Sequence, residues 1–145
     1  MTLGEIKVEA LRCMGVNLSE DIRAEHMEEL IADENYKSYL VNMVGPINRC
    51  LSLFERRGLV SPENGKSMRI TDATADDFNM EELRVPCVLL ELIPLFIKSE
   101  LYIQDDKEIA AAALTQFERA MSEFTGNLGV QNRQSAVIDV FGGYK

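Results

Sequence analysis

The sequence predicts a mainly α-helical protein: a helical bundle of about four to five helices with a small β-hairpin or arm and an extended C-terminal tail. Three observations support this fold class. Apolar residues recur at helical spacing through most of the chain. Two sequences typical of helix N-termini stand before such stretches. Between the helical stretches, the pair Asn64-Gly65 is a strong hairpin signal.

The length and charge of the chain limit its possible functions. The 145 residues are enough for one domain with a sizeable core. The formal net charge is −9, from 24 acidic and 15 basic residues. Because an acidic surface repels phosphate, this balance disfavours a protein that wraps or grips DNA. It is compatible with a protein that surrounds DNA without binding it.

The N-terminal sequence and the cysteines favour a reducing cytoplasm as the compartment of synthesis. The stretch MTLGEIKVEALRCMG lacks the apolar core of a signal peptide, so we expect no targeting segment. Cys13, Cys50 and Cys87 are odd in number and form no CxxC pair. This spacing argues against a disulfide framework or a zinc site.

The first half of the chain predicts three helices. Thr2 and Glu5 form a capping box that opens a helix over about 3–14. A short helix follows from near Ala24. One apolar stripe then continues through about 35–57, which predicts a single long helix bent near Pro46.

The middle of the chain predicts the hairpin. Strand-like runs at about 58–61 and 67–71 flank Asn64-Gly65, within an insertion over about 58–72. A connecting loop with about one turn of helix is expected to follow.

The most apolar stretch, 85–106, predicts a core helix over about 86–103, with Pro86 in its first turn and a bend at Pro94. Glu91, Lys98 and Glu100 interrupt its apolar run, so we predict no membrane span. Apolar residues cover more than half of the helix surface. Such a helix is either central in its own domain or also buried by a neighbouring subunit.

The last predicted helix begins at a second capping box, formed by Asp105 and Glu108, and ends at Gly126. We therefore expect a helical domain over 1–129 and an extended tail over 130–145. The tail has β character without a nearby partner strand, so it is expected either to be disordered or to add a strand to another protein.

No residue pattern indicates catalysis, a cofactor or a metal. His26 is the single histidine, and it could form a catalytic Cys–His pair with any of the three cysteines. The sequence around it favours the other interpretation, an exposed helical histidine beside acidic residues. The acidic pairs Asp76-Asp77, Glu81-Glu82 and Asp105-Asp106 lack EF-hand spacing, and loop solvation and helix capping explain them.

The order of these features resembles the head–tail connector, or adaptor, proteins of tailed bacteriophages. The resemblance covers most of residues 3–124 and is clearest in the last helical pair, VPCVLLELIPLFIKSELYIQDDKEIAAAALTQFERAM. The residues that match the family pattern are Leu92-Ile93-Pro94, Ile97, Ser99-Glu100-Leu101-Tyr102, Asp105-Asp106 and Phe117-Glu118. The hairpin region matches nothing in the family, and the family has no catalytic residue to transfer.

The resemblance implies a structural virion protein, made in the host cytoplasm and located in the neck between head and tail. Its partners would be further copies of itself in a ring of about twelve subunits, the portal protein, and stopper or tail proteins. DNA would pass through the ring without specific binding, and no cofactor or membrane is implied. The candidate interface residues lie on the core helix and in the tail: Leu89, Ile93, Phe96, Ile97, Val137, Ile138, Val140, Phe141 and Tyr144.

Two alternatives remain open on the sequence. A cytosolic helical protein-binding or regulatory module would use the groove beside the hairpin to hold a partner helix. Within the phage interpretation, a stopper or tail-terminator is the other possibility.

Overall fold

A computed structural model of the chain describes residues 1–14, 27–60, 69–71 and 78–138. For Asn35, Glu81, Glu82 and residues 127–138, only the backbone is described. These parts are mainly helical, as predicted, and their only β pairing is an isolated bridge between Thr2 and Asn79. The elements in chain order are α1 (Leu3–Cys13), α2 (Met27–Ala32), α3 (Glu34–Val41), α4 (Val44–Arg56), the 3-10 helix η2 (Met80–Leu83), α5 (Cys87–Leu90), α6 (Ile93–Leu101) and α7 (Lys107–Ile138).

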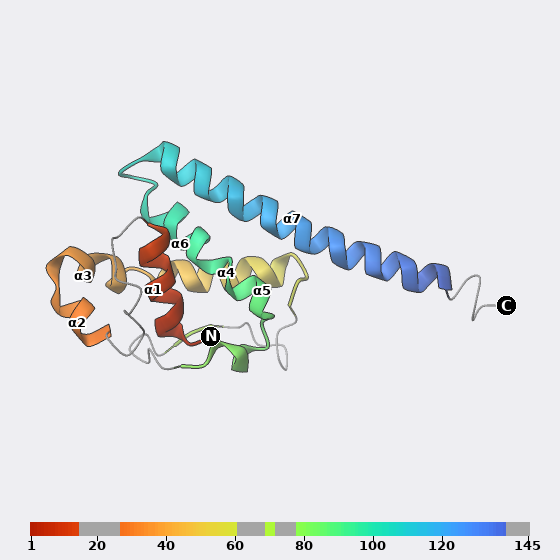
Figure 1. Cartoon of the computed structure of the whole chain (residues 1–145), viewed down its shortest axis with the longest axis horizontal. Coiled ribbons are helices and arrows are strands. Elements are labelled where there is room, and N and C mark those ends of the chain that lie inside the picture. Colours follow the sequence, from red (N-terminus) through yellow and green to blue (C-terminus); the bar gives the residue numbers. More distant parts are fainter. Residues whose placement is uncertain (15–26, 61–68, 72–77, 139–145) are drawn as a thin grey trace.

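Helix α6 is the centre of the body. It packs against α1, α4 and α7, while α2 and α3 pair with each other at one side (Figure 1). Phe117 of α7 joins these layers, because its ring centroid lies 5.2 Å from that of Phe96 on α6 and 6.2 Å from that of Phe54 on α4. The side chains that are fully buried around this contact include Leu3, Ile6, Leu11, Met43, Ile47, Leu51, Met80, Leu89, Leu90 and Ile93.

The start of α1 confirms the predicted capping box. The Thr2 hydroxyl accepts a hydrogen bond from the Glu5 N–H at 3.2 Å, and the Glu5 carboxylate accepts one from the Thr2 N–H at 3.0 Å. The N–H of Leu3 also donates to the carbonyl of Phe78 at 2.8 Å. The N-terminus is thereby fixed both to its own helix and to the segment that precedes η2.

The predicted single helix over 35–57 is wrong, because the chain forms two helices, α3 and α4. Pro46 lies in the first turn of α4, where it needs no intrahelical N–H donor. Its ring would clash with a helical carbonyl four residues earlier, at Asn42. The helix therefore stops before Met43, the N-cap of α4, instead of bending at the proline. Gly58, at φ 70°, follows the C-cap of α4, where a glycine adopts this conformation without strain.

The described residues do not support the predicted hairpin. Its turn, within 61–68, lies outside them, and the described residues on either side form no strand. Instead, a side chain of α4 satisfies the backbone of Ile70. Oδ1 of Asn48 accepts a hydrogen bond from the Ile70 N–H at 2.8 Å, and Nδ2 donates one to the Ile70 carbonyl at 3.2 Å. The amide thus provides the pairing that a second strand would have provided.

We predict that Asn48→Ala lowers the free energy of unfolding by about 1–3 kcal/mol, because it leaves both polar groups of buried Ile70 without this partner. Chemical denaturation of the two proteins measures this. Asn42→Ala is the matched control, because Asn42 makes only an exposed bond to the Ser38 carbonyl at 2.8 Å. Equal stability of both variants would contradict a structural role for Asn48.

The predicted core helix over 86–103 is divided into α5 and α6 by a turn at Glu91–Leu92. Pro86 is the N-cap of α5, and Pro94 lies in the first turn of α6. The residue four positions before Pro94 is Leu90, the last of α5. The proline therefore ends one helix and begins the next, where a bend was predicted.

Helix α7 begins one residue later than its predicted capping box implies. The cap is Asp106, not Asp105: Oδ1 of Asp106 accepts hydrogen bonds from the N–H groups of Glu108 at 3.1 Å and Ile109 at 3.2 Å. Asp105 and Glu108 match the D-x-x-E pattern of a capping box. The adjacent Asp106 is an equally good N-cap residue, because its carboxylate can also accept hydrogen bonds from the first N–H groups of the helix.

Asp106→Ala is expected to destabilise the protein by about 1 kcal/mol, since it removes the acceptor for two N–H groups at the start of α7. Asp105→Ala has the same charge change one position away and is expected to have almost no effect. Thermal denaturation of the two variants separates them. The reverse order of stabilities would assign the cap to Asp105.

The prediction that α7 ends at Gly126 is wrong, because the helix continues to Ile138. A C-terminal glycine ends a helix where the chain turns through positive φ. Among the described glycines only Gly58 has positive φ, so Gly126 is an ordinary helical residue. The first part of the predicted extended tail, 130–145, is therefore helical, and 139–145 lie outside the described residues. Figure 1 shows that the C-terminal part of α7 extends well beyond the other helices.

Candidate functional site

The four candidate interface residues on the core helix lie in the interior of the chain. Leu89, Ile93 and Ile97 have no exposed surface, and Phe96 is 8% exposed. They are covered by the chain's own helices, because α6 packs against α1, α4 and α7. They support the fold, and in this conformation other side chains must form any contact with a partner.

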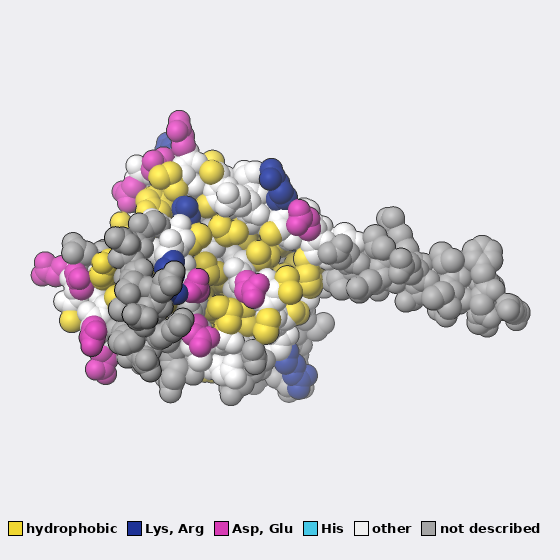
Figure 2. All heavy atoms as spheres, in the orientation of Figure 1, with side chains coloured by type: hydrophobic (Ala, Val, Ile, Leu, Met, Phe, Trp, Pro, Cys, Tyr) yellow, Lys and Arg dark blue, Asp and Glu magenta, His cyan; other side chains and the backbone are white. Residues whose placement is uncertain are grey.

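The outer side of α5 and α6 carries the apolar surface that remains available. Val88 is 54% exposed, and Leu92 and Leu95 are half-buried at the edge of the core. Val88 belongs to α5, Leu92 is the N-cap of α6, and Leu95 lies in the first turn of α6. Figure 2 shows hydrophobic side chains gathered over α5, α6 and the adjoining part of α7. The apolar residues of 86–103 that predicted a core helix therefore include both buried residues and the exposed Val88.

Further large apolar side chains are exposed on other elements. They are Val41 on α3 at 65%, Ile103 in the turn after α6 at 57%, and, less exposed, Ile31, Ile109 and Leu114. Single exposed apolar residues are normal in folded proteins. Here they occur on three parts of the surface besides the α5–α6 face.

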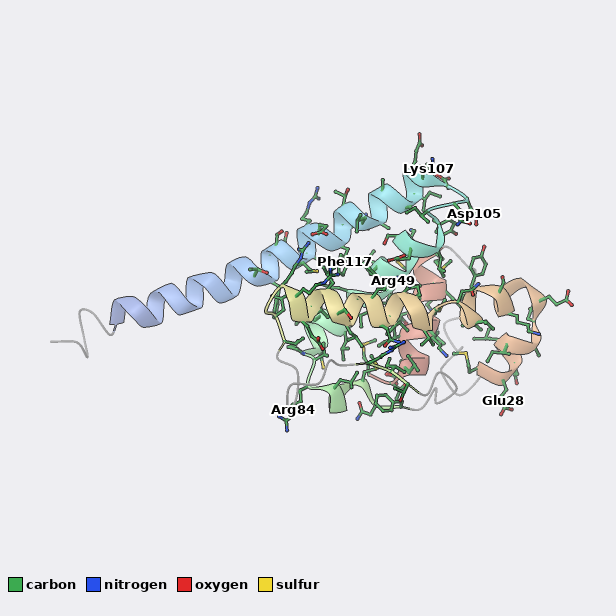
Figure 3. The ribbon with its side chains drawn as sticks, turned by 180° about the vertical axis from the view of Figure 1, so that it is seen from behind. Glu28, Arg49, Arg84, Asp105, Lys107 and Phe117 are labelled. Atoms are coloured by element: carbon green, nitrogen blue, oxygen red, sulfur yellow. The ribbon has the colours of Figure 1, made fainter. Side chains whose placement is uncertain are left out.

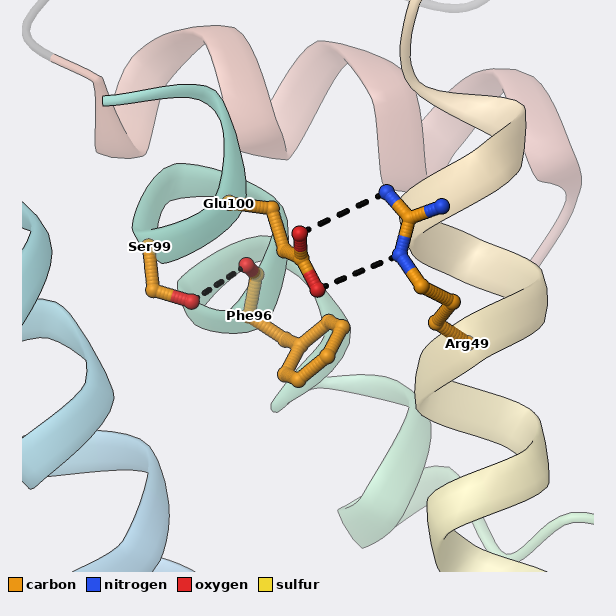
Figure 4. Close-up of polar contacts among 4 residues, drawn as sticks. All are labelled: Arg49, Phe96, Ser99 and Glu100. Atoms are coloured by element: carbon orange, nitrogen blue, oxygen red, sulfur yellow. Dashed lines mark hydrogen bonds and ion pairs between the residues drawn. The ribbon is translucent and has the colours of Figure 1, made fainter. Parts of the chain in front are cut away.

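Two ion pairs hold the surfaces of the central helices together. The guanidinium of Arg49 on α4 donates to both carboxylate oxygens of Glu100 on α6, at 3.2 and 3.4 Å (Figure 4). On the same helix, the buried hydroxyl of Ser99 donates to the Phe96 carbonyl at 2.7 Å. Because the Arg49 side chain is 57% exposed, the pair contributes no more than about 1 kcal/mol.

The second ion pair connects α4 with α7. Arg57, at the end of α4, lies 2.9 Å from a carboxylate oxygen of Glu118. Together with the contact of Phe117 with Phe54, this pair fixes the first half of α7 on the body. Phe124 also packs against the core, and beyond Gly126 only the backbone of α7 is described.

The C-terminal candidate residues are only partly described. Val137 and Ile138 belong to the last turn of α7, where the backbone alone is described. Val140, Phe141 and Tyr144 lie outside the described residues. Their part in an interface remains a prediction from the sequence.

Two of the three cysteines, Cys13 and Cys50, have raised pKa values. Burial raises the pKa of the Cys50 thiol far above its ordinary value, and the Glu100 carboxylate raises it further. Burial also raises the pKa of Cys13, although Lys98 partly opposes this. Cys87 is exposed. Both raised values favour the thiol over the reactive thiolate, and His26 lies outside the described residues.

Among the residues whose side chains are described, no three histidine, cysteine or acidic groups lie close enough together to hold a metal ion. Asp76-Asp77 lie outside the described residues. Of the predicted acidic pairs, Asp105-Asp106 is described, and the Asp106 carboxylate caps α7.

Membrane insertion also finds no candidate segment: within the described ranges, no helix combines the length and apolar character that a bilayer span requires.

Comparisons of the chain with protein-family models, with curated proteins and with solved structures find no match.

Proposed function

We propose that the protein is a structural connector of a tailed-phage virion, which forms a ring between the portal and the lower neck or tail proteins. The observation that carries the proposal is the length of α7. Its first half is fixed on the body by Phe117 and by the Arg57–Glu118 ion pair, and its second half extends beyond the body (Figure 1).

A solitary helical extension of this composition is not stable in water by itself. The segment contains Gly126 and Gly129, each of which costs about 1 kcal/mol relative to alanine in a helix. Helical segments in proteins gain most of their stability from packing of an apolar face. A neighbouring subunit or a portal would supply that packing for the C-terminal part of α7.

The resemblance of the α6–α7 pair to adaptor proteins gives the type of assembly. In a closed ring, each subunit uses two different surfaces, one for each neighbour. The exposed apolar residues on separate parts of this chain meet that requirement. The net charge of −9 would keep the channel wall from holding the DNA phosphates. In this assembly, the segment around Asn64-Gly65 is a candidate hairpin arm.

Native mass spectrometry of the full chain tests the proposal, first alone over a range of concentrations and then mixed with the portal protein of the same genome. We expect a monomer that assembles into a ring, with the portal's symmetry when the portal is present. A chain that stays monomeric at all concentrations and ignores the portal would contradict the proposal and favour the cytosolic binding module.

A further inference from the structure

The helix pair α2–α3 presents an acidic surface with exposed apolar residues. Its exposed acidic side chains are Glu28, Glu29, Asp33 and Glu34, against a single exposed base, Lys37. Ile31 and Val41 lie among them, and Val41 is the most exposed of the large apolar side chains described. We call Glu28, Glu29, Glu34, Ile31 and Val41 the acidic end.

The opposite side of the body carries two exposed arginines and an exposed apolar residue, together with exposed Glu91. Helix α4 starts beside α3 and crosses the body away from the α2–α3 pair (Figure 1), and Arg56 is its last residue. Arg84 precedes α5 and is exposed, as is Val88 on α5 itself. We call Arg56, Arg84 and Val88 the basic end.

The two ends lie on opposite sides of the molecule. Figure 3 shows Glu28 and Arg84 at opposite ends of the body. Figure 2 shows acidic side chains along the α2–α3 edge, whereas near the other edge it shows basic side chains with an acidic one beside them. They are too far apart to meet within one chain. They are placed so that the acidic end of one copy can reach the basic end of another.

We propose that the acidic end of one copy docks onto the basic end of the next, and that this head-to-tail contact is the repeating interface of the ring. The inference rests on the proposed function and names the surfaces that join its subunits. Contact between different surfaces on opposite sides of a subunit is heterologous, and repetition of such a contact closes a ring when the rotation allows it.

The proposed interface combines two kinds of complementarity. Ile31 and Val41 on one copy and Val88 on the next supply apolar surface, and burial of this surface provides the attraction. The opposite charges select the partner surface and accelerate association, because juxtaposition of like charges at an interface is costly. Assembly should therefore weaken as salt screens the charges.

Two charge-reversal variants test the interface. Glu28→Lys with Glu29→Lys inactivates the acidic end, and Arg56→Glu with Arg84→Glu inactivates the basic end. By native mass spectrometry, each variant alone should need a concentration at least about tenfold higher than the original chain to assemble. In a mixture, the unchanged ends of the two variants are opposite in charge, and so are their two reversed ends. The two variants should therefore assemble together into a ring of alternating subunits at the concentration of the original chain.

The matched control is Glu108→Lys with Glu123→Lys, two exposed acidic residues of α7. It changes the net charge as much as the acidic-end variant does, and Glu108, like Glu28, stands in the first turn of its helix. Circular dichroism confirms that all variants fold. The control should form rings at the concentration of the original chain.

Three results would overturn the inference, and they differ in what else they contradict. Normal rings from both charge-reversal variants would reject this interface and leave the proposed connector function standing. A mixture of the two variants that assembles no better than either variant alone would have the same meaning. An original chain that never assembles, alone or on the portal, would contradict the proposed function together with the interface.

Discussion

Phe96→Asp is expected to lower the free energy of unfolding by about 3–5 kcal/mol, which is a large fraction of the total stability of a typical domain. Phe96 is 8% exposed on the central helix α6, and its ring contacts Phe117 of α7 at a centroid distance of 5.2 Å. The substitution removes this contact and places a carboxylate in an apolar environment. Urea denaturation followed by circular dichroism measures the effect.

Two control variants separate the loss of the ring from the burial of a charge. Phe96→Leu retains an apolar side chain and is expected to cost less than half as much as the aspartate. Val88→Asp places the same charge on the exposed side of α5 and is expected to change stability by no more than about 0.5 kcal/mol. If Phe96→Asp were as stable as Val88→Asp, the assignment of α6 to the core would be wrong.

Deletion of residues 130–145 is expected to abolish ring assembly while the body keeps its fold. The core side chains that hold α7 on the body, including Phe117 and Met121, precede the deleted part. The deleted part belongs to the segment of α7 that extends away from the body (Figure 1). The melting temperature of the truncated monomer should therefore change by only a few degrees. In a domain of this size, a change of about 1 kcal/mol in the free energy of unfolding shifts the melting temperature by about 2–4 °C.

A full-length variant distinguishes the loss of specific side chains from the loss of chain length. Val137→Ser with Ile138→Ser keeps the length of the chain and removes apolar surface from the last turn of α7. We expect it to weaken assembly in the same direction as the deletion. A large loss of thermal stability in the truncated monomer would show that these residues belong to the fold, and unchanged assembly of both variants would remove the C-terminus from the interface.

The sequence predicted the buried faces of the helices well, because apolar periodicity depends on local geometry. Ile47, Leu51 and Phe54 were predicted to share one stripe, and all three are fully buried on α4. The same periodicity did not indicate where helices end. The stripe continued past Pro46, although the proline ring excludes a helical carbonyl at Asn42, so that one predicted helix is two.

Other parts of the fold depended on contacts that are distant in the sequence. The amide of Asn48 satisfies the backbone of Ile70, and nothing in the sequence near Ile70 indicates this partner. For the candidate site, the excess of apolar residues on the core helix was correctly recognised. Periodicity alone did not show which of these apolar residues are buried in the chain's own core and which are exposed. Leu89 and Ile97 are buried, whereas Val88 is exposed.

Electron microscopy of the full chain mixed with the portal protein of the same genome tests the central claim most directly. We predict a ring of this protein stacked coaxially on one face of the portal, with an open central channel and one subunit for each portal subunit. Portal particles that remain bare in the presence of excess protein, at concentrations where the protein is folded, would contradict the connector function.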